Sequence, residues 1–111
     1  MRAIKIDAVN QKVEVIDFEG GCSGIQKEIG VDLFTCVGLG EDTLFVDDEG
    51  LINGTDDFFQ MEGLQPLAGN GLILATDNEG ESVSTEMEVP KVRFMNRTEV
   101  ALMAQLGAFG I

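Results

Sequence analysis

Five carboxylate side chains in two short runs are the residues of this sequence with the clearest capacity for binding. Asp47, Asp48 and Glu49 form the first run, and Asp56 and Asp57 form the second. Carboxylate oxygens bind Ca²⁺ and Mg²⁺, but these runs lack the alternating ligand positions of a calcium-binding loop. We therefore predict no metal site. The acids either lie in solvated turns or form part of an acidic face that contacts a basic partner.

Other side chains offer little catalytic chemistry. The chain has no histidine, which excludes a Ser-His-Asp triad. Cys22 and Cys36 form no CxxC motif, and two thiols are too few for a zinc site. Cys36 lies in an apolar segment, where we expect it to act as a small hydrophobic side chain. Gly69-Asn70-Gly71 leads into a predicted strand, whereas phosphate-binding glycine loops open a helix. We predict a non-enzymatic protein without a cofactor.

The charge of the chain is strongly negative and unevenly distributed. There are 20 Asp and Glu residues against 7 Lys and Arg residues, a net charge of −13. From Glu28 to Pro90 there is no Lys or Arg, so no ion pair can form within that stretch. This balance opposes direct binding of nucleic acid or of an anionic membrane and permits a basic partner. The stretch is either a solubilising surface or an anionic recognition face.

The length and the hydropathy pattern favour one soluble domain. With 111 residues the chain is long enough for a single domain, which we place at residues 1–111. No apolar run approaches the roughly 18 residues of a membrane-spanning helix. Charged residues alternate with apolar residues from the first positions onward, unlike a secretory signal. We therefore expect a cytoplasmic protein.

Alternating apolar and charged residues over 3–7 and 12–17 predict a β-hairpin at the start of the chain. Its core-facing side chains would be Ile4, Ile6, Val13 and Val15. A hairpin at this position would supply the first strands of a sheet.

A short helix is predicted over residues 23–29. Ser23 and Gln26 have the spacing of a capping box, and Gly30 supplies a stop signal. The side chains that this helix would bury are Ile25 and Ile29.

Strand patterns and turn signals alternate in the middle of the chain. The predicted strands cover residues 33–37, 43–46, 72–76, 81–87 and 92–95. The first two should pair as a second hairpin, connected through residues 38–42. The run 72–76 is continuously apolar, which indicates a buried central strand. We expect a turn at 47–50, where Gly50 would take a positive φ, and a loop over 51–69.

Asn96 and Glu99 form a second capping-box pattern, which predicts a helix from residue 97 to about residue 106. Its side chains are mostly apolar, as is the tail, so residues 97–111 either wedge into the core or pack against another subunit. The residues expected at such an oligomer interface are Val100, Met103, Leu106 and Phe109. Together with the hairpins, this helix indicates a small α+β domain with a mostly antiparallel sheet.

Several motifs occur in an order that resembles one family. They are LFVDDEGL at 44–51, FF at 58–59, QPLAG at 65–69, GLILATD at 71–77 and EGESVS at 79–84. In these motifs the chain is similar to small acidic proteins of unknown function that bacteriophages, plasmids and other mobile elements carry. The resemblance covers about residues 1–95. It implies a bacterial or phage cytoplasmic setting and an accessory role, and it implies no catalytic residues.

Three hypotheses on function follow. The first is an inhibitor or DNA-mimic decoy whose acids bind a basic host protein that handles nucleic acid, such as a defence nuclease. The second is a self-assembling accessory protein that oligomerises through the C-terminal helix. The third is an oligomeric binder of a nucleotide, in which Lys91 and Arg93 join Arg2 or Lys5 in a cationic site. We favour the first, because the acid-only stretch and the mobile-element resemblance point to it together.

Overall fold

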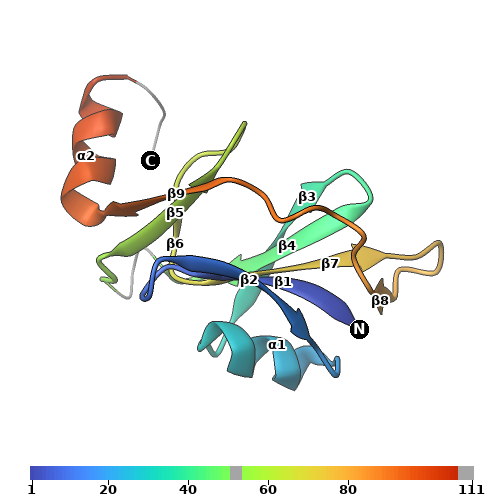
Figure 1. The fold of residues 1–111 in the computed structure, drawn as a ribbon. Helices are drawn as coiled ribbons and strands as arrows, with labels where there is room; N and C mark the ends of the chain where they lie inside the picture. The colour runs from blue at the N-terminus through green and yellow to red at the C-terminus, as the bar shows by residue number, and fades with distance from the viewer. Residues whose placement is uncertain (51–53, 108–111) are drawn as a thin grey trace.

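The computed structural model describes residues 1–50 and 54–107, which form two antiparallel sheets and two helices (Figure 1). The larger sheet has the strand order β2-β1-β7-β4-β3, with β8 paired to β7. Its strands are β1 (Arg2–Asp7), β2 (Lys12–Asp17), β3 (Phe34–Leu39), β4 (Asp42–Asp47), β7 (Gly71–Thr76) and β8 (Ser82–Val83). The apolar run at 72–76 is therefore a central strand, as predicted.

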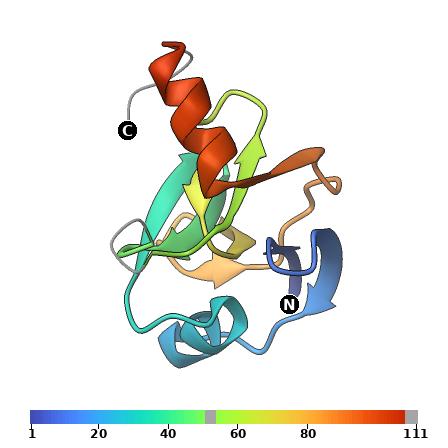
Figure 2. The ribbon, with the colours of Figure 1, turned by 90° about the vertical axis from the view of Figure 1, so that its left-hand side faces the viewer.

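The smaller sheet has the order β6-β5-β9, and each sheet has a helix beside it. The remaining elements are β5 (Asp57–Met61), β6 (Leu67–Ala68), β9 (Val92–Asn96), α1 (Cys22–Ile29) and α2 (Arg97–Gln105). Figure 2 shows α1 under the larger sheet and α2 next to the smaller sheet at the opposite end of the molecule. The predicted α+β fold with mostly antiparallel sheets is confirmed.

The larger sheet is covered on both faces, which gives two core layers. On one face Ile4, Leu44 and Ile73 pack against Phe59 and Met61 of the smaller sheet. On the other face α1 covers a second cluster, whose members are Ala3, Phe18, Ile25, Ile29, Phe45, Leu72 and Leu74. The inner strands β1, β7 and β4 contribute to both layers, which explains their high apolar content.

The predicted N-terminal hairpin is confirmed, with one error in its core residues. β1 and β2 pair antiparallel, with Ile4 opposite Val15 and Ile6 opposite Val13. Ile4 and Ile6 are buried, and Val13 packs partly against the core. Val15 is 46% exposed, so the prediction that it faces the core is wrong. Its strand β2 lies at the edge of the sheet, where the core does not extend far enough to cover it.

The predicted first helix is confirmed, but its predicted capping box is wrong. α1 begins at Cys22, and Gly21 occupies the N-cap position without a side-chain hydrogen bond. Ser23 therefore lies inside the helix instead of capping it. Gly30 adopts a left-handed conformation with φ of 72° and ends the helix as predicted. The buried residues of α1 are Ile25 and Ile29, also as predicted.

The second predicted hairpin is confirmed as β3 and β4. Gly40 and Glu41 connect the paired residues Leu39 and Asp42, and Gly40 takes a positive φ of 82° that a tight turn requires. The two weaker strand patterns differ in outcome. The pattern at 92–95 is confirmed as β9, whereas the pattern at 81–87 forms only the two-residue strand β8.

The predicted loop over 51–69 is wrong, because it contains β5 and β6. Phe58 and Phe59 occupy consecutive positions of β5 and are 1% and 0% exposed. Consecutive buried residues break the alternation that marks a half-exposed strand. β5 buries both because it is the central strand of the smaller sheet and is covered on both faces. Residues 51–53 of the expected loop lie outside the described residues.

α2 begins where its capping box predicts. The Glu99 N–H donates to Asn96 Oδ1 at 2.8 Å, and the Asn96 N–H donates to Glu99 Oε1 at 3.2 Å. Val100 is 2% exposed and packs with Phe58 and Met95 of the smaller sheet. The helix thus contacts the core through one side and is not buried along its length. Within residues 1–50 and 54–107, no helix is long and apolar enough to cross a membrane.

Asp7 closes the turn of the first hairpin. Its carboxylate accepts the backbone N–H of Asn10 at 3.0 Å and the side-chain amide of Asn10 at 2.8 Å. Burial raises the pKa of Asp7, but these hydrogen bonds and the charges of Lys5 and Lys12 outweigh it and hold the pKa below its usual 3.8. The carboxylate therefore stabilises the fold fully above pH 3.8, and this contribution is lost as the pH falls through the lowered pKa.

Replacing Asp7 with asparagine should lower the free energy of unfolding by about 1–2 kcal/mol at neutral pH, because charge-assisted hydrogen bonds are lost. The difference from wild type should shrink below pH 3.8, where the wild-type carboxylate begins to take up its proton. Urea unfolding over a pH series measures this. Asp32→Asn is the control, because Asp32 is exposed and its carboxylate makes no hydrogen bond or ion pair within residues 1–50 and 54–107. A difference that stays constant with pH would contradict the role assigned to Asp7.

Candidate functional site

The first acid run lies in a turn that packs tightly against the smaller sheet. Asp47 ends β4, and the turn continues through Asp48 and Glu49 to Gly50. Gly50 does not have the positive φ that we predicted. Instead, a Cβ on Gly50 would lie 2.6 Å from the Ala68 Cβ, so only glycine allows this turn to approach β6.

The second acid run lies next to the first. The Gly69 N–H donates to the Asp57 backbone carbonyl at 2.8 Å, and a Cβ on Gly69 would lie 3.8 Å from the Asp47 Cβ. Gly69 therefore connects the beginning of β5 with the end of β4. The five acids predicted from the sequence come from two segments that the fold brings together, and we call them the acidic end: Asp47, Asp48, Glu49, Asp56 and Asp57.

Several acids of the acidic end also stabilise local structure. Asp47 Oδ1 accepts the Glu49 N–H at 2.9 Å, and Asp56 Oδ1 accepts the Arg97 N–H at the start of α2 at 3.1 Å. Asp48 and Asp56 are exposed, whereas the other three are half-buried. Binding tests at this end therefore need amide substitutions, which keep these hydrogen-bond acceptors in place.

The acidic end borders a cavity of about 310 Å³ with apolar walls. The walls come from β3, β4 and β6, and the rim comes from the acidic turn. The residues that define it are Val37, Val46, Leu67 and Ala68 in the walls and Asp47, Asp48 and Glu49 at the rim. Lys and Arg side chains combine an apolar stem with a charged head, so both parts would find complementary surroundings here. We call this site the acid-rimmed cavity.

The acids do not form a metal-binding group within the described part of the chain. No three Asp, Glu, His or Cys side chains among residues 1–50 and 54–107 are arranged so that they could hold a metal ion.

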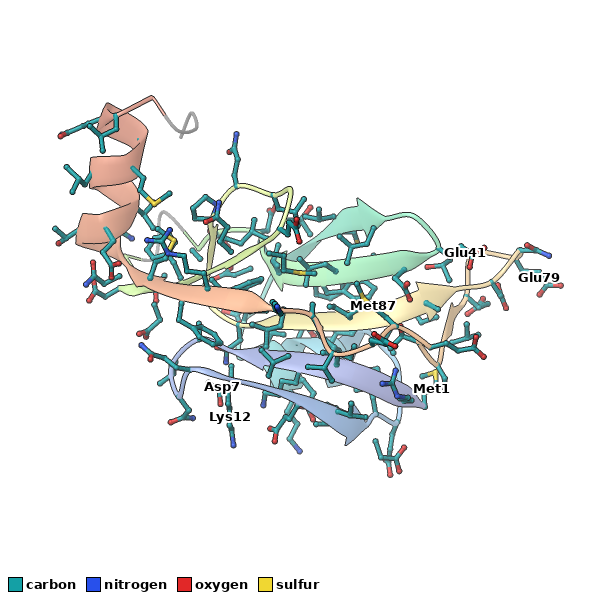
Figure 3. The ribbon with its side chains drawn as sticks, turned by 45° about the horizontal axis from the view of Figure 1, so that its top comes forward. Met1, Asp7, Lys12, Glu41, Glu79 and Met87 are labelled. Atoms are coloured by element: carbon teal, nitrogen blue, oxygen red, sulfur yellow. The ribbon has the colours of Figure 1, made fainter. Side chains whose placement is uncertain are left out.

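A second group of acids lies at the opposite end of β4. Figure 3 shows Glu41 and Glu79 at this tip of the molecule. Asp42 begins β4, and Asp77 closes the β7–β8 turn by accepting the N–H groups of Glu79 and Glu81, both at 2.9 Å. We call these five residues the acidic tip. The six residues of β4 separate the tip from the acidic end by about 17 Å, and these two groups together hold ten of the 20 acidic residues.

The basic residues proposed for a nucleotide site do not converge. Lys91 and Arg93 line an open cavity of about 420 Å³ at the end of β9, together with Glu62. Arg2 instead donates to backbone carbonyls, and Lys5 pairs with a glutamate of α1 at 3.2 Å. The cavity therefore combines two cations with a carboxylate, which weakens it as a site for an anion.

The cysteines and the predicted interface residues have different surroundings. Cys22 and Cys36 are exposed free thiols. Cys36, which we expected to act as a small hydrophobic side chain, is solvent-exposed because its strand β3 lies at the sheet edge. Among the predicted interface residues, Val100 lies in the chain's own core, Met103 packs partly against it, and Leu106 is 77% exposed. Phe109 lies outside the described residues. Leu102, which was not among the predicted interface residues, is 55% exposed.

Comparisons with known proteins identify a family. No curated protein and no solved structure matches the chain. A family model described as a domain of unknown function, DUF3846, matches residues 1–98. The match includes all the described strands, the acidic end and the start of α2. The chain therefore belongs to the family of DUF3846 domains of unknown function.

Proposed function

We propose that this protein is a non-enzymatic binding protein whose acidic end recognises a basic segment of another protein. The observation that carries the proposal is the acid-rimmed cavity, in which carboxylates of the turn 47–49 border walls formed by Val37, Val46 and Leu67. A lysine or arginine side chain can place its methylene stem against such walls and its charged head at the rim. A solubilising surface needs no cavity of this kind.

The partner proposed is a basic host protein that handles nucleic acid. Such proteins present clusters of Lys and Arg that neutralise phosphates, and these clusters complement an acidic surface. The resemblance to proteins of phages and plasmids supports a cytoplasmic accessory role in which the protein inhibits a host defence protein or acts as its decoy. The proposal depends on the five carboxylates of the acidic end and not on the net charge of the whole chain.

Electrostatics sets the strength expected of this contact. An exposed ion pair contributes about 0.2–1 kcal/mol, so three carboxylates of the acidic end together account for roughly a tenfold change in affinity. Salt screens exposed charges over about 10 Å at 0.1 M ionic strength. Binding at the acidic end should therefore weaken as salt is added, while the apolar part of the contact remains.

The test compares two sets of substitutions that change the net charge equally. Asp48→Asn, Glu49→Gln and Asp57→Asn together should weaken capture of basic proteins from a bacterial lysate about tenfold. The control set is Glu62→Gln, Glu86→Gln and Glu88→Gln. These three glutamates are exposed, make no hydrogen bond or ion pair within residues 1–50 and 54–107, and lie outside both acidic groups. Mass spectrometry of the proteins retained at low and high salt measures the difference.

Two outcomes would argue against the proposal. Equal losses from both sets would mean that net charge, and not the acidic end, determines binding. Retention of basic proteins by all variants at high salt would mean that the contact is not electrostatic. Thermal unfolding of both variants shows whether the fold is intact.

A second candidate function is self-assembly through α2. Leu102 and Leu106 are 55% and 77% exposed on a helix that has no basic residue in its last turn. Exposed leucines on one helix are typical of a surface that another subunit covers. An oligomer in equilibrium sedimentation of the full chain favours this candidate, and a monomer removes its support.

A further inference from the structure

We propose that the basic partner adds a β-strand to the open edge of β3. The added strand is apolar in its centre, which pairs with that edge, and carries basic residues near its two ends. This inference rests on the function proposed above and specifies how the partner's backbone binds. Three features of β3 support strand addition: its position, its hydrogen-bonding pattern and the charges at its ends.

β3 is an unprotected edge. It is the last strand in the order β2-β1-β7-β4-β3 and pairs only with β4 in the described part of the chain. Its sequence, FTCVGL, contains no charged residue. The opposite edge strand β2, KVEVID, carries charges at Lys12, Glu14 and Asp17, which discourage pairing with another chain. Only one of the two edges is thus suited to receive a strand.

The hydrogen bonds of β3 show which of its backbone groups remain available. The Asp48 N–H donates to the Leu33 carbonyl at 3.1 Å, just before β3 begins. Antiparallel strands alternate between hydrogen-bonded and non-hydrogen-bonded pairs. The backbone groups of Thr35, Val37 and Leu39 therefore face β4. The N–H and C=O groups of the alternate residues face outward, and these are Phe34, Cys36 and Gly38.

Acids flank this edge at both ends. At one end the exposed Asp48 of the acidic end donates its N–H to Leu33 just before β3, and at the other end the exposed Glu41 of the acidic tip lies in the turn that follows β3. Thr35 and Val37 also line the acid-rimmed cavity, so an added strand would place side chains over that cavity. A strand that matches this surface is apolar in its middle and carries lysine or arginine at its ends.

The same charges disfavour a second copy of this chain as the occupant. Antiparallel pairing of β3 with β3 would bring the acidic end of one copy next to the acidic tip of the other. Like charges across a contact oppose association. A basic partner is therefore the occupant that the structure favours.

The probe is a peptide of about ten residues with alternating Val and Thr in its centre and a pair of lysines at each end. Cys36→Pro should lower the affinity of the full chain for this peptide at least about tenfold, because proline removes an outward N–H that the peptide needs. Cys36→Ser keeps that N–H and should bind like wild type. The structure places the Cys36 N–H outside the β3–β4 ladder, so proline is compatible with this edge position.

Modified peptides test the same bonds on the unaltered protein. Two versions carry N-methyl groups, one at odd and one at even positions of the centre. In a β-strand only every second residue forms hydrogen bonds with a given neighbouring strand, so only one of the two methylated peptides should lose affinity. Fluorescence anisotropy of labelled peptides measures all these affinities, and thermal unfolding checks the fold of the variants.

The outcomes separate this inference from the proposed function. Strand addition is wrong if Cys36→Pro binds the peptide like wild type and both methylated peptides bind like the unmethylated one. In that case, weaker binding by the variant with Asp48→Asn, Glu49→Gln and Asp57→Asn still supports the acidic end. If that triple variant binds the peptide like wild type while Cys36→Pro binds it more weakly, the proposed role of the acidic end is wrong and strand addition at β3 is supported. No binding of the peptide to wild type overturns the inference. A dimer that Cys36→Pro dissociates would make a second copy the occupant.

Discussion

Replacing Phe59 with alanine should lower the free energy of unfolding by about 3–5 kcal/mol, the range observed for large aromatic residues in protein cores. Phe59 is 0% exposed and belongs to the cluster that joins the two sheets. A Cβ on Gly71 would lie 2.9 Å from Cζ of its ring and 3.0 Å from Leu44 Cδ1. The ring thus occupies the space that the missing side chain of Gly71 leaves on the central strand. Without the ring, no neighbouring side chain on β7 fills this space, so a cavity should remain.

Urea unfolding of wild type and Phe59→Ala measures this loss. Phe34→Ala is the matched control, because Phe34 is half-buried on the edge strand β3 and packs only with the α1 layer. The control should lose distinctly less stability than Phe59→Ala. If Phe59→Ala cost less than about 1 kcal/mol, the smaller sheet would not be held to the larger sheet through this residue.

Local sequence patterns predicted the elements whose neighbours in space are also neighbours in the chain. The hairpin of β1 and β2 and the hairpin of β3 and β4 each combine strand patterns with a short turn, and both were correct. The capping box at Asn96 was correct because its two hydrogen bonds form within one helical turn. The apolar run of β7 identified a central strand because burial on both faces removes alternation.

The elements that the sequence did not predict depend on distant partners. Phe58 and Phe59 are buried together only because both faces of β5 are covered, the Phe59 face by the larger sheet and the Phe58 face by α2. Ser23 has a capping-box partner by spacing, yet the chain turns into α1 at Gly21, where no side-chain cap forms. Gly50 was predicted to be a turn glycine with a positive φ, whereas the structure requires a glycine there because the backbone lies close to Ala68. Sequence spacing alone does not contain these contacts.

The candidate site, like the fold, was only partly predictable from the sequence. The two acid runs were evident as residue types, and the sequence indicated that they lie in or near turns. Their proximity depends on the hydrogen bond between Gly69 and Asp57 and on the packing of Gly50 against β6. The uncharged sequence of β3 is visible in the chain, but its position at an open edge follows only from the order of all the strands in the sheet.

Arg2 was one of two alternative residues in the hypothesis of a cationic nucleotide site, and the structure gives it a structural role. Its Nη1 donates to the carbonyls of Thr85 and Met87 at 2.9 Å and 2.8 Å. The backbone of Arg2 also bonds this segment, because its carbonyl accepts the Thr85 N–H at 2.9 Å. Thr85 is fully buried, and its hydroxyl donates to Asp42 at 2.6 Å. Arg2 therefore fixes the connection between β8 and β9, which links the two sheets.

Arg2→Met should consequently lower the free energy of unfolding by about 3 kcal/mol, because two hydrogen bonds from a charged donor are lost and two carbonyls keep no equivalent partner. Methionine retains the apolar stem, so the loss reports on the guanidinium group. Arg2→Lys keeps the charge but lacks the planar guanidinium group with its fixed N–H donors, so it should retain only part of the stability. Hydrogen exchange adds a local readout: the hydrogen-bonded amides of Thr85 and Met87 should exchange faster in Arg2→Met, since this segment opens when its anchor is removed. If Arg2→Lys were as stable as wild type, charge alone would hold the segment, and the paired bonds to the two carbonyls would not be the cause.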